Sequence, residues 1–435
     1  MRILALAPEL PFPPNSGGKA RTYHLLRELS RDHGITLVTF ADAGADADAD
    51  ADANADADGR SSETDPPFPV EVVRVPRVTP PLYAELYGAD PERSEAAFRT
   101  LARESGEPWF VSYYACPEMA SALERVARRQ RFDLVLIEHT FMGRFLPSLP
   151  GDVPKVLDLH NVHSLMGERE AKDGGDEEAR TREAARTWRF ERAVCAACEA
   201  CWVCSEAEAA AAADLLGIRR PRVVPNGVDT SHFAPAEGAT VPGRLLFTGT
   251  MNYGPNVEAA RFFTAKVLPR IRAAVPAASF HVVGTKPTQE VRALGSGSAV
   301  VVHGAVPDVR PHFREADIVV VPLLHGGGTR LKILDAAACG KAIVTTPLGA
   351  EGLPLRPGED AVFAESAVAL AHEIVLLLSD PARRESLGRN ARRVAEQYDW
   401  SLIGAGARKL VRESFESRHR DALERGRLTA GIGGA

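Results

Sequence analysis

The sequence predicts an α/β protein with two doubly wound parallel-sheet domains. Three observations support this fold class. The chain has 435 residues, more than the roughly 100–200 that one domain commonly holds. Short apolar runs alternate with longer segments of helical periodicity, as repeated β-α units require. This alternation stops in a Pro- and Gly-rich stretch at residues 225–243 and then begins again. The stretch therefore predicts a linker between two sheets.

The first half opens with the apolar run Arg2–Ala7, a helical pattern from Gly18 to His33 and a second apolar run at Ile35–Phe40. This β-α-β order is typical of the start of a parallel sheet. An alternating Ala/Asp tract follows. Because it has no apolar face to bury and its charges repel one another, we expect residues 41–65 to form a disordered insertion. Further strands of this sheet are expected at Val70–Arg74, Leu134–Glu138, Val156–Asp158, Trp202–Cys204 and Arg222–Val224.

The second half repeats the pattern, which predicts a second doubly wound sheet. Its strands are expected at Leu245–Thr248, Ser279–Val283, Val300–His303, Ile318–Val321, Ala342–Thr345 and Ala361–Phe363. Helical patterns at Ser366–Ser379 and Pro381–Gln397 close it. We therefore expect domains at residues 1–236 and 237–400, a helix at 401–420 that packs back on the first domain, and a flexible tail at 421–435.

Composition excludes some classes of function. The formal net charge is −6, and the aspartates of the Ala/Asp tract more than account for it, so the rest of the chain is close to neutral. Such a chain lacks the clustered basic face that nucleic-acid binding needs. The first apolar stretch ends at Pro8 and is too short for a secretory signal, and no run approaches the ~20 apolar residues of a membrane span. The sequence therefore predicts a cytoplasmic protein without a nucleic-acid partner.

A glycine-rich loop follows the strand at Ile318–Val321 and leads into a helix. Its three glycines are Gly326, Gly327 and Gly328, and the residues after them include Thr329, Arg330 and Lys332. Glycines allow backbone N–H groups to approach an anion, and the two cations could add charge-assisted bonds to a diphosphate. A tight turn without a ligand is the alternative, and the spacing is not that of a P-loop.

The segment GGGTRLKILDAAACGKAIVTTPLGAEGL at residues 326–353 resembles the donor-binding segment of retaining glycosyltransferase family 4, which has the GT-B fold. Other stretches are similar to that family in the same order: Gly17–Gly18, LDLHN at Leu157–Asn161, VCSEAE at Val203–Glu208, VPNGVD at Val224–Asp229, FTGTMNYGPN at Phe247–Asn256 and HGAVPDV at His303–Val309. The resemblance covers nearly the whole chain. It implies two Rossmann-like domains that face one another across a cleft.

The resemblance also implies roles for individual residues. Family members usually carry two glutamates separated by seven residues. Asp335 stands at the second position, where a carboxylate holds the ribose, and Gly327 stands at the first, which removes a sugar contact. The family's cations after the strand end at Gly249 are replaced by Thr250–Tyr253, so we expect Arg330 and Lys332 to supply the charge. The other expected donor contacts are Gly17, Gly18, Gly249, Asn252, Gly304, Val306, Gly326, Gly328, Thr329 and Leu331.

His160 matches a family histidine at the end of a cleft-lining strand, and an imidazole there could hydrogen-bond the sugar. A structural histidine is the alternative. The expected catalytic residues are therefore His160, Arg330 and Lys332. Lys19, Arg21 and His24 follow the Gly17–Gly18 turn; a solvated helix face is the alternative for Lys19 and Arg21, and His163 is interpreted as structural.

Two other patterns have a structural alternative. Cys195, Cys198, Cys201 and Cys204 have the spacing C-x2-C-x2-C-x2-C, which resembles a zinc or iron-sulfur ligand set. Their neighbours are mostly Ala and Val, so we interpret them as small apolar residues and expect no metal site. In the expected acceptor-binding domain, aromatic residues could stack on a sugar or pack a core. They are Tyr83, Tyr87, Trp109, Tyr113 and Tyr114.

The resemblance thus implies a retaining, hexosyltransferase-like enzyme of exopolysaccharide or cell-envelope glycan synthesis. It would use a nucleoside-diphosphate-sugar and need neither a cofactor nor a metal. Its acceptor would be a glycan, a lipid-linked molecule or a small molecule, and a lipid-linked acceptor would bring it to the inner face of the membrane. The alternatives are a nucleotide-sugar epimerase or hydrolase of the same fold and an inactive nucleotide-sugar-binding protein.

Overall fold

The computed structural model describes residues 1–42, 66–77, 79–86, 91–165, 176–236, 238, 240–297, 299–326 and 329–432. Tyr87, Gly327, Gly328 and the Ala/Asp tract from residue 43 onward lie outside these ranges. Contacts divide the chain into two compact units, one of Met1–Val224 with Gly404–Ala435 and one of Pro225–Ile403. The first unit is therefore built from two separate segments, and the second unit begins at Pro225 rather than at residue 237.

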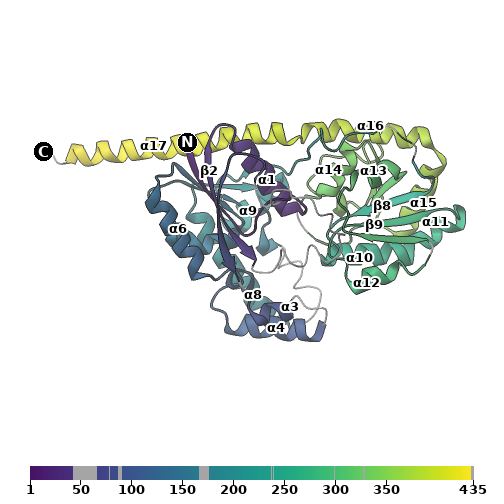
Figure 1. Ribbon diagram of the computed structural model, residues 1–435, viewed down its shortest axis with the longest axis horizontal. Helices are drawn as coiled ribbons and strands as arrows, with labels where there is room; N and C mark the ends of the chain where they lie inside the picture. The colour runs from purple at the N-terminus through teal and green to yellow at the C-terminus, as the bar shows by residue number, and fades with distance from the viewer. Residues whose placement is uncertain are drawn as a thin grey trace, which may run out of the picture. The chain divides into compact units, whose positions relative to one another are not determined.

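The first unit contains a seven-stranded parallel sheet in the order β3-β2-β1-β4-β5-β6-β7. Strand β2 of this sheet is labelled in Figure 1. Its strands are β1 (Arg2–Ala7), β2 (Gly34–Asp42), β3 (Glu71–Arg77), β4 (Leu134–Glu138), β5 (Lys155–Asp158), β6 (Ala200–Val203) and β7 (Arg222–Val223). Strands buried on both faces give continuous apolar runs, and β1 and β4 match the prediction residue for residue. Ala41 and Asp42 extend β2 and pair with β3, so the expectation that they belong to the insertion is wrong.

Helices connect these strands. They are α1 (Gly17–Leu29), α3 (Pro81–Leu86), α4 (Pro91–Glu104), α5 (Trp109–Ser112), α6 (Pro117–Arg129), α8 (Glu177–Ala196) and α9 (Glu206–Leu216), with a 3-10 helix η1 (Thr140–Ser148). Helix α1 begins where it does because the Ser16 side chain accepts the backbone N–H of Lys19, which satisfies one of the donors at the helix start. Its Leu25 and Leu26 are fully buried.

The second unit contains a six-stranded parallel sheet in the order β10-β9-β8-β11-β12-β13. Its strands are β8 (Arg244–Thr248), β9 (Ser279–Val283), β10 (Val300–Gly304), β11 (Ile318–Val321), β12 (Ala342–Thr345) and β13 (Val362–Phe363). Its helices are α10 (Gly254–Phe262), the π-helix η2 (Phe263–Val267), α11 (Leu268–Ala274), α12 (Gln289–Leu294), α13 (Arg310–Glu315), α14 (Leu331–Ala338), the 3-10 helix η3 (Leu348–Ala350), α15 (Ala367–Ser379) and α16 (Pro381–Gln397).

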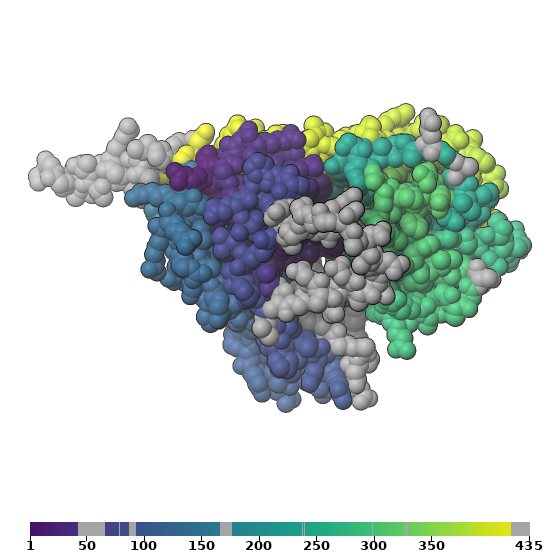
Figure 2. Space-filling view, viewed as in Figure 1, coloured from purple at the N-terminus to yellow at the C-terminus, as the bar shows by residue number. Residues whose placement is uncertain are grey.

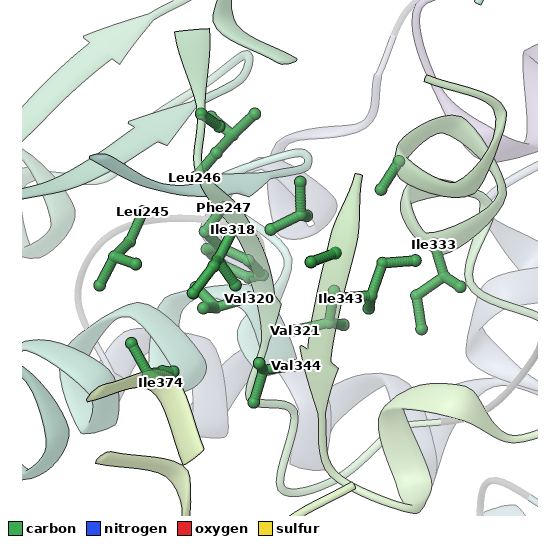
Figure 3. Close-up of a cluster of buried hydrophobic side chains, with 14 of the residues drawn as sticks. Leu245, Leu246, Phe247, Ile318, Val320, Val321, Ile333, Ile343, Val344 and Ile374 are labelled. Atoms are coloured by element: carbon green, nitrogen blue, oxygen red, sulfur yellow. The ribbon is translucent and has the colours of Figure 1, made fainter. Parts of the chain in front are cut away.

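In both sheets the strand order reverses at one point, which lies between β1 and β4 in the first unit and between β8 and β11 in the second. In open parallel sheets, ligands bind outside the carboxyl ends of the strands at such switch points. In the second unit an apolar core that includes Phe247, Val320 and Ile343 holds these strands (Figure 3). Each such buried side chain stabilises the fold by about 1.5–3 kcal/mol. The core thereby fixes the strand ends from which functional residues extend.

The last helix, α17 (Trp400–Ile432), begins in the second unit and belongs to the first from Gly404 onward. A Cβ on Gly404 would lie 2.3 Å from the Cβ of Glu28, so a glycine is needed where α17 meets α1. Arg408 Nη1 then lies 2.8 Å from the buried carboxylate of Glu28. The helix is the yellow ridge on the first unit in Figure 2. It continues to Ile432, so most of the tail predicted from residue 421 is helical. No helix within the described ranges is long and apolar enough to cross a membrane.

Candidate functional site

The carboxyl end of β8 forms a close-packed site in the second unit. Gly249 follows the strand with φ 152°, and a Cβ there would lie 2.7 Å from Asn256 Nδ2 and 2.8 Å from Lys332 Nζ. Any larger residue would displace both groups. Gly249, Asn256, Arg330 and Lys332 are called the β8 site below.

Lys332 is held in the β8 site from two sides. Its Nζ donates to Asn256 Oδ1 at 2.7 Å and lies 4.3 Å from the centre of the Phe247 ring. Asn256 is oriented in turn because its Nδ2 donates to the backbone oxygen of Thr250 at 2.9 Å. Burial, reinforced by the positive charge of Arg330, lowers the pKa of Lys332 to about 7. An anion bound beside this ammonium group would stabilise its charged form.

Arg330 immediately precedes α14 and is buried, with 7% of its surface exposed. The loop before it is close-packed, because a Cβ on Gly326, which has φ 112°, would lie 3.2 Å from Arg330 Nη2 and 3.2 Å from Pro255 Cγ. Thr329 Oγ1 is buried and has no hydrogen-bond partner among the described residues. The structure thus brings Arg330 and Lys332 together with Gly249, while the glycines at 327 and 328 lie outside the described residues.

Asp335 lies three residues after Lys332 on α14. Burial raises the pKa of its carboxyl group to about 7, and the neighbouring Lys332 partly opposes this shift. A carboxyl group at this position could accept ribose hydroxyls, as the resemblance implies. It is a proton donor or an acceptor depending on the pH.

The other predicted donor-binding residues of the second unit do not take part in the contacts of Lys332. The half-buried side chains of Leu331 and Val306 pack against the apolar core. Asn252 is exposed, and Gly304 ends the edge strand β10 with φ 73°. None of the described hydrogen bonds or ion pairs joins these four residues to Lys332.

In the first unit, Gly17 and Gly18 form the first turn of α1 as predicted from the β-α pattern. A Cβ on Gly18 would lie 3.6 Å from His139 Nε2 and 4.0 Å from His160 Nδ1. The first turn of α1 therefore meets the edges of two imidazole rings. His160 is a predicted site residue, and His139 is not.

His160 belongs to a buried polar network. Its Nε2 lies 2.7 Å from Glu138 Oε2 and 3.6 Å from Asp158 Oδ2. Arg21 binds both oxygens of Asp158, at 2.7 and 2.8 Å, and donates to the backbone oxygen of Val224. Arg21, Glu138, Asp158 and His160 are called the His160 network below.

This network corrects the interpretation of Arg21. Only 1% of its surface is exposed, so it lies on neither a solvated helix face nor a ligand-facing one. Lys19 is partly exposed, and its Nζ lies 3.6 Å from Glu9 Oε2, whereas His24 is buried.

Glu138, Asp158 and His160 also bring three metal-ligating atoms within 4.8 Å of one another. Arg21 already neutralises Asp158, which leaves less negative charge to attract a cation.

His139, like Asn256 and Glu138, is a site residue that sequence reasoning missed. His139 and His160 follow the adjacent strands β4 and β5 with φ of 66° and 58°, a left-handed conformation that non-glycine residues rarely adopt. Their rings stack with centroids 3.7 Å apart. Burial, and then the positive charges of His160, His163 and Arg21, hold the pKa of His139 well below its ordinary value. Its position directly after the buried strand β4, as His160 stands two residues after β5, is the signal that could have found it.

The remaining candidates of the first unit, which are His163 and the aromatic residues, make contacts that hold the fold together. The backbone N–H and Nδ1 of His163 contact Glu191, as expected of a structural histidine. Among the aromatic residues, Tyr83 is buried against Tyr113, and Tyr114 stacks on Phe141 at 4.5 Å. Tyr83 also donates to the backbone oxygen of Trp109.

The cysteines are free thiols in apolar surroundings. Cys195, Cys201 and Cys204 are buried, and Cys198 is half-buried. Burial raises the pKa of Cys198 to about 12 and also raises that of Cys204, so the thiolate forms are disfavoured. Cys204 Sγ donates to the backbone oxygen of His160. Within the part of the chain that the structure describes, no group of three metal ligands includes them.

Two family models match the chain. The model for Glycosyltransferase Family 4 matches residues 88–232, and the model for Glycosyl transferases group 1 matches residues 242–380. The first match lies mostly in the first unit and the second lies wholly in the second. A relative in Kineococcus radiotolerans, D-inositol 3-phosphate glycosyltransferase, is 28% identical over 349 residues, which cover 72% of this chain and 78% of the relative.

Solved structures share the fold over nearly the whole chain. Sucrose-phosphate synthase from Thermosynechococcus elongatus aligns with a TM-score of 0.68 and 18% identity, covering 96% of this chain and all of that one. Anabaena HepE in complex with UDP and glucose aligns with a TM-score of 0.62 and 14% identity, covering 94% of this chain and 99% of that one. The strand order of the two sheets and both family matches agree with these likenesses. The chain therefore carries a Glycosyltransferase Family 4 domain followed by a Glycosyl transferases group 1 domain, and it has the GT-B fold.

Proposed function

We propose that this glycosyltransferase takes a sugar from a nucleoside-diphosphate-sugar and transfers it to a hydroxyl acceptor with retention of anomeric configuration. The observation that carries the proposal is the β8 site. Arg330 and Lys332 lie at the carboxyl end of β8, where doubly wound sheets bind nucleotides, and Gly249 leaves room for the ammonium group. The UDP bound to HepE supports a nucleoside diphosphate as part of the donor.

The chemistry follows from where charge develops. The bond between the anomeric carbon and the diphosphate oxygen breaks, and a bond to the acceptor oxygen forms on the same face of the sugar. The acceptor proton passes to the departing phosphate, so no protein base is required. Arg330 and Lys332 would stabilise the negative charge of the leaving diphosphate, which is the main catalytic contribution we assign to the protein. Asp335 would hold the ribose hydroxyls.

Ligand-detected NMR with UDP-, GDP-, ADP- and dTDP-sugars tests the donor. We expect one of them to bind, and Arg330→Ala and Lys332→Ala each to weaken that binding about 10- to 100-fold, because each removes a charge-assisted bond. Lys266→Ala, which removes an exposed lysine of η2, is the matched control. Wild-type protein that binds none of the four, or variants that bind as tightly as wild type, would contradict the proposal.

Product analysis tests the reaction. NMR of the anomeric proton in the product distinguishes retention from inversion, and unchanged turnover after dialysis against EDTA is expected of a metal-independent enzyme. Release of free sugar or an epimerised donor without acceptor would favour the hydrolase or epimerase reading, and binding without turnover would favour an inactive binder. We place the acceptor among exopolysaccharide or cell-envelope glycan precursors. Cosedimentation with vesicles that contain polyprenyl phosphate tests whether the acceptor is lipid-linked.

A further inference from the structure

Glu138 is a buried carboxylate whose two oxygens have unequal surroundings. It ends β4 next to the switch point of the first sheet and has no exposed surface. Its Oε2 accepts from Thr22 Oγ1 at 3.0 Å and lies 2.7 Å from His160 Nε2. Its Oε1 has no hydrogen-bond partner among the described residues. Burial of a carboxylate with so few partners costs stability.

Two other buried carboxylates of the first unit, Asp158 and Glu191, are satisfied more completely, although Glu28 Oε1 and Glu183 Oε2 also lack a hydrogen-bond partner among the described residues. Asp158 receives two hydrogen bonds from Arg21, one on each oxygen. Glu191 accepts two backbone N–H groups and the Ser164 hydroxyl, and both of its oxygens are used. A carboxylate kept only to hold the fold together is expected to be satisfied in this way. Glu138 concentrates its contacts on the oxygen that faces His160.

The position of the His160 ring gives that contact a consequence. Since Nε2 lies against Glu138, the other nitrogen, Nδ1, lies on the side of the first turn of α1, 4.0 Å from the place of a Cβ on Gly18. His139 stacks on the ring and limits its rotation. A carboxylate that accepts from one ring nitrogen fixes the proton there and leaves the other nitrogen as an acceptor.

We propose that Glu138 is a positioning residue of the transfer reaction: it holds the proton of His160 on Nε2, so that Nδ1 accepts a hydrogen bond from a sugar hydroxyl beside the first turn of α1. This inference rests on the proposed function. The hydroxyl belongs either to the donor sugar or to the acceptor. Glu138 itself touches neither.

The test begins with histidine side-chain 15N NMR of the full-length wild-type protein at pH 8.5, with the His160 signal identified by its loss in His160→Gln. We expect the proton on Nε2. Glu138→Met, which keeps the volume and removes the acceptor, is expected to give a mixture of tautomers. Thr22→Val, which removes the other contact of the same oxygen, is expected to leave the tautomer unchanged. A proton on Nδ1 in the wild type overturns the proposal even if Glu138→Met does not fold.

Kinetics and binding then locate the hydroxyl. In Glu138→Met we expect turnover to fall about 10- to 100-fold, the size of effect seen when the partner that orients a functional histidine is removed. If the donor sugar supplies the hydroxyl, the variant binds the selected nucleotide-sugar more weakly but the nucleoside diphosphate unchanged. If the acceptor supplies it, both bind unchanged and only transfer falls. Wild-type turnover in this variant overturns the inference. Because the tautomer is measured without substrate, failure of this inference is distinguishable from failure of the proposed function.

Discussion

Lys332 Nζ and Asn256 Oδ1 lie 2.7 Å apart, although 76 residues separate them in the chain. The asparagine is 5% exposed and its amide nitrogen is tied to the backbone after β8. It therefore fixes the position of the ammonium group relative to the strand end. Donor affinity should depend on Asn256 even though the proposed phosphate contacts come from Arg330 and Lys332.

Replacing Asn256 with Leu should weaken donor binding about tenfold. Leucine has nearly the same volume as asparagine, but it offers the Lys332 ammonium group no hydrogen-bond acceptor. Calorimetric titration with the donor selected by NMR measures this. Asn390→Leu, which removes an amide that donates to Glu359 on the surface, is the control and should bind as wild type. Equal affinities of the two variants would show that Asn256 does not orient Lys332.

Nucleoside diphosphate binding should take up a proton at pH 8. The pKa of Lys332 is about 7 in the free protein, so the group is mostly neutral at pH 8 and becomes charged when a diphosphate binds. Affinity should therefore rise as the pH falls from 8 to 7. Calorimetry in Tris and in HEPES, which differ in ionisation enthalpy, gives the number of protons. Lys332→Met should abolish the uptake at pH 8; uptake that persists in this variant would assign the proton to another group.

Replacing Gly249 with Ala should abolish donor binding and cost about 1–3 kcal/mol of stability. The new methyl group would lie 2.8 Å from Lys332 Nζ, and the backbone at φ 152° disfavours a side chain. Gly358→Ala separates the two effects, because Gly358 has φ 79° with open space around it. That control should lose only about 1 kcal/mol. Urea unfolding and donor titration measure both quantities, and a Gly249→Ala protein that still binds donor would refute the packing argument.

The second unit should lose stability as the pH falls below 6.5. His281 is buried against His303, with Nδ1 and Nε2 of the two rings 2.9 Å apart. Burial, and then the positive charges of Arg244, His303 and His312, lower its pKa from 6.5 to about 4. The unfolded chain therefore binds the proton first, and the loss amounts to roughly 3 kcal/mol by pH 4.

Hydrogen exchange of the β9 amides between pH 7 and pH 4.5, corrected for the intrinsic rate, measures this loss. His281→Gln should flatten the pH dependence. His372→Gln, which changes an exposed histidine on α15, should leave it as steep as in the wild type. A steep dependence that survives in His281→Gln would assign the acid sensitivity to other groups.

The fold could be predicted from the sequence because parallel strands buried on both faces leave continuous apolar runs. Strands β9, β11 and β12 match the predicted ranges residue for residue. The domain boundary could not be read so closely. The stretch after Val224 is rich in turn residues, and only the three-dimensional contacts show that the second unit already begins at Pro225.

The candidate site was predictable where it depends on local sequence and unpredictable where it depends on distant partners. Glycines that precede a helix with basic residues near its start predict the loop that contains Gly326 and Arg330. Arg21 looks like a solvated residue on the first turns of a helix, and its partner Asp158 lies 137 residues away. No periodicity or spacing encodes such a pair. The same is true of Asn256, which resembles an ordinary early-helix asparagine until Lys332 is placed beside it.

The passage of the chain through the second unit and back has a consequence for its synthesis on the ribosome. Glu28 in α1 is made early, but the arginine that pairs with it stands at position 408, after the whole second unit. The second unit can fold as soon as it emerges, since its sequence is continuous. The first unit must wait with one face of α1 uncovered until the residues from Gly404 onward have been made. A protein released early, at a stop codon near residue 403, would carry a finished second unit on an incomplete first one.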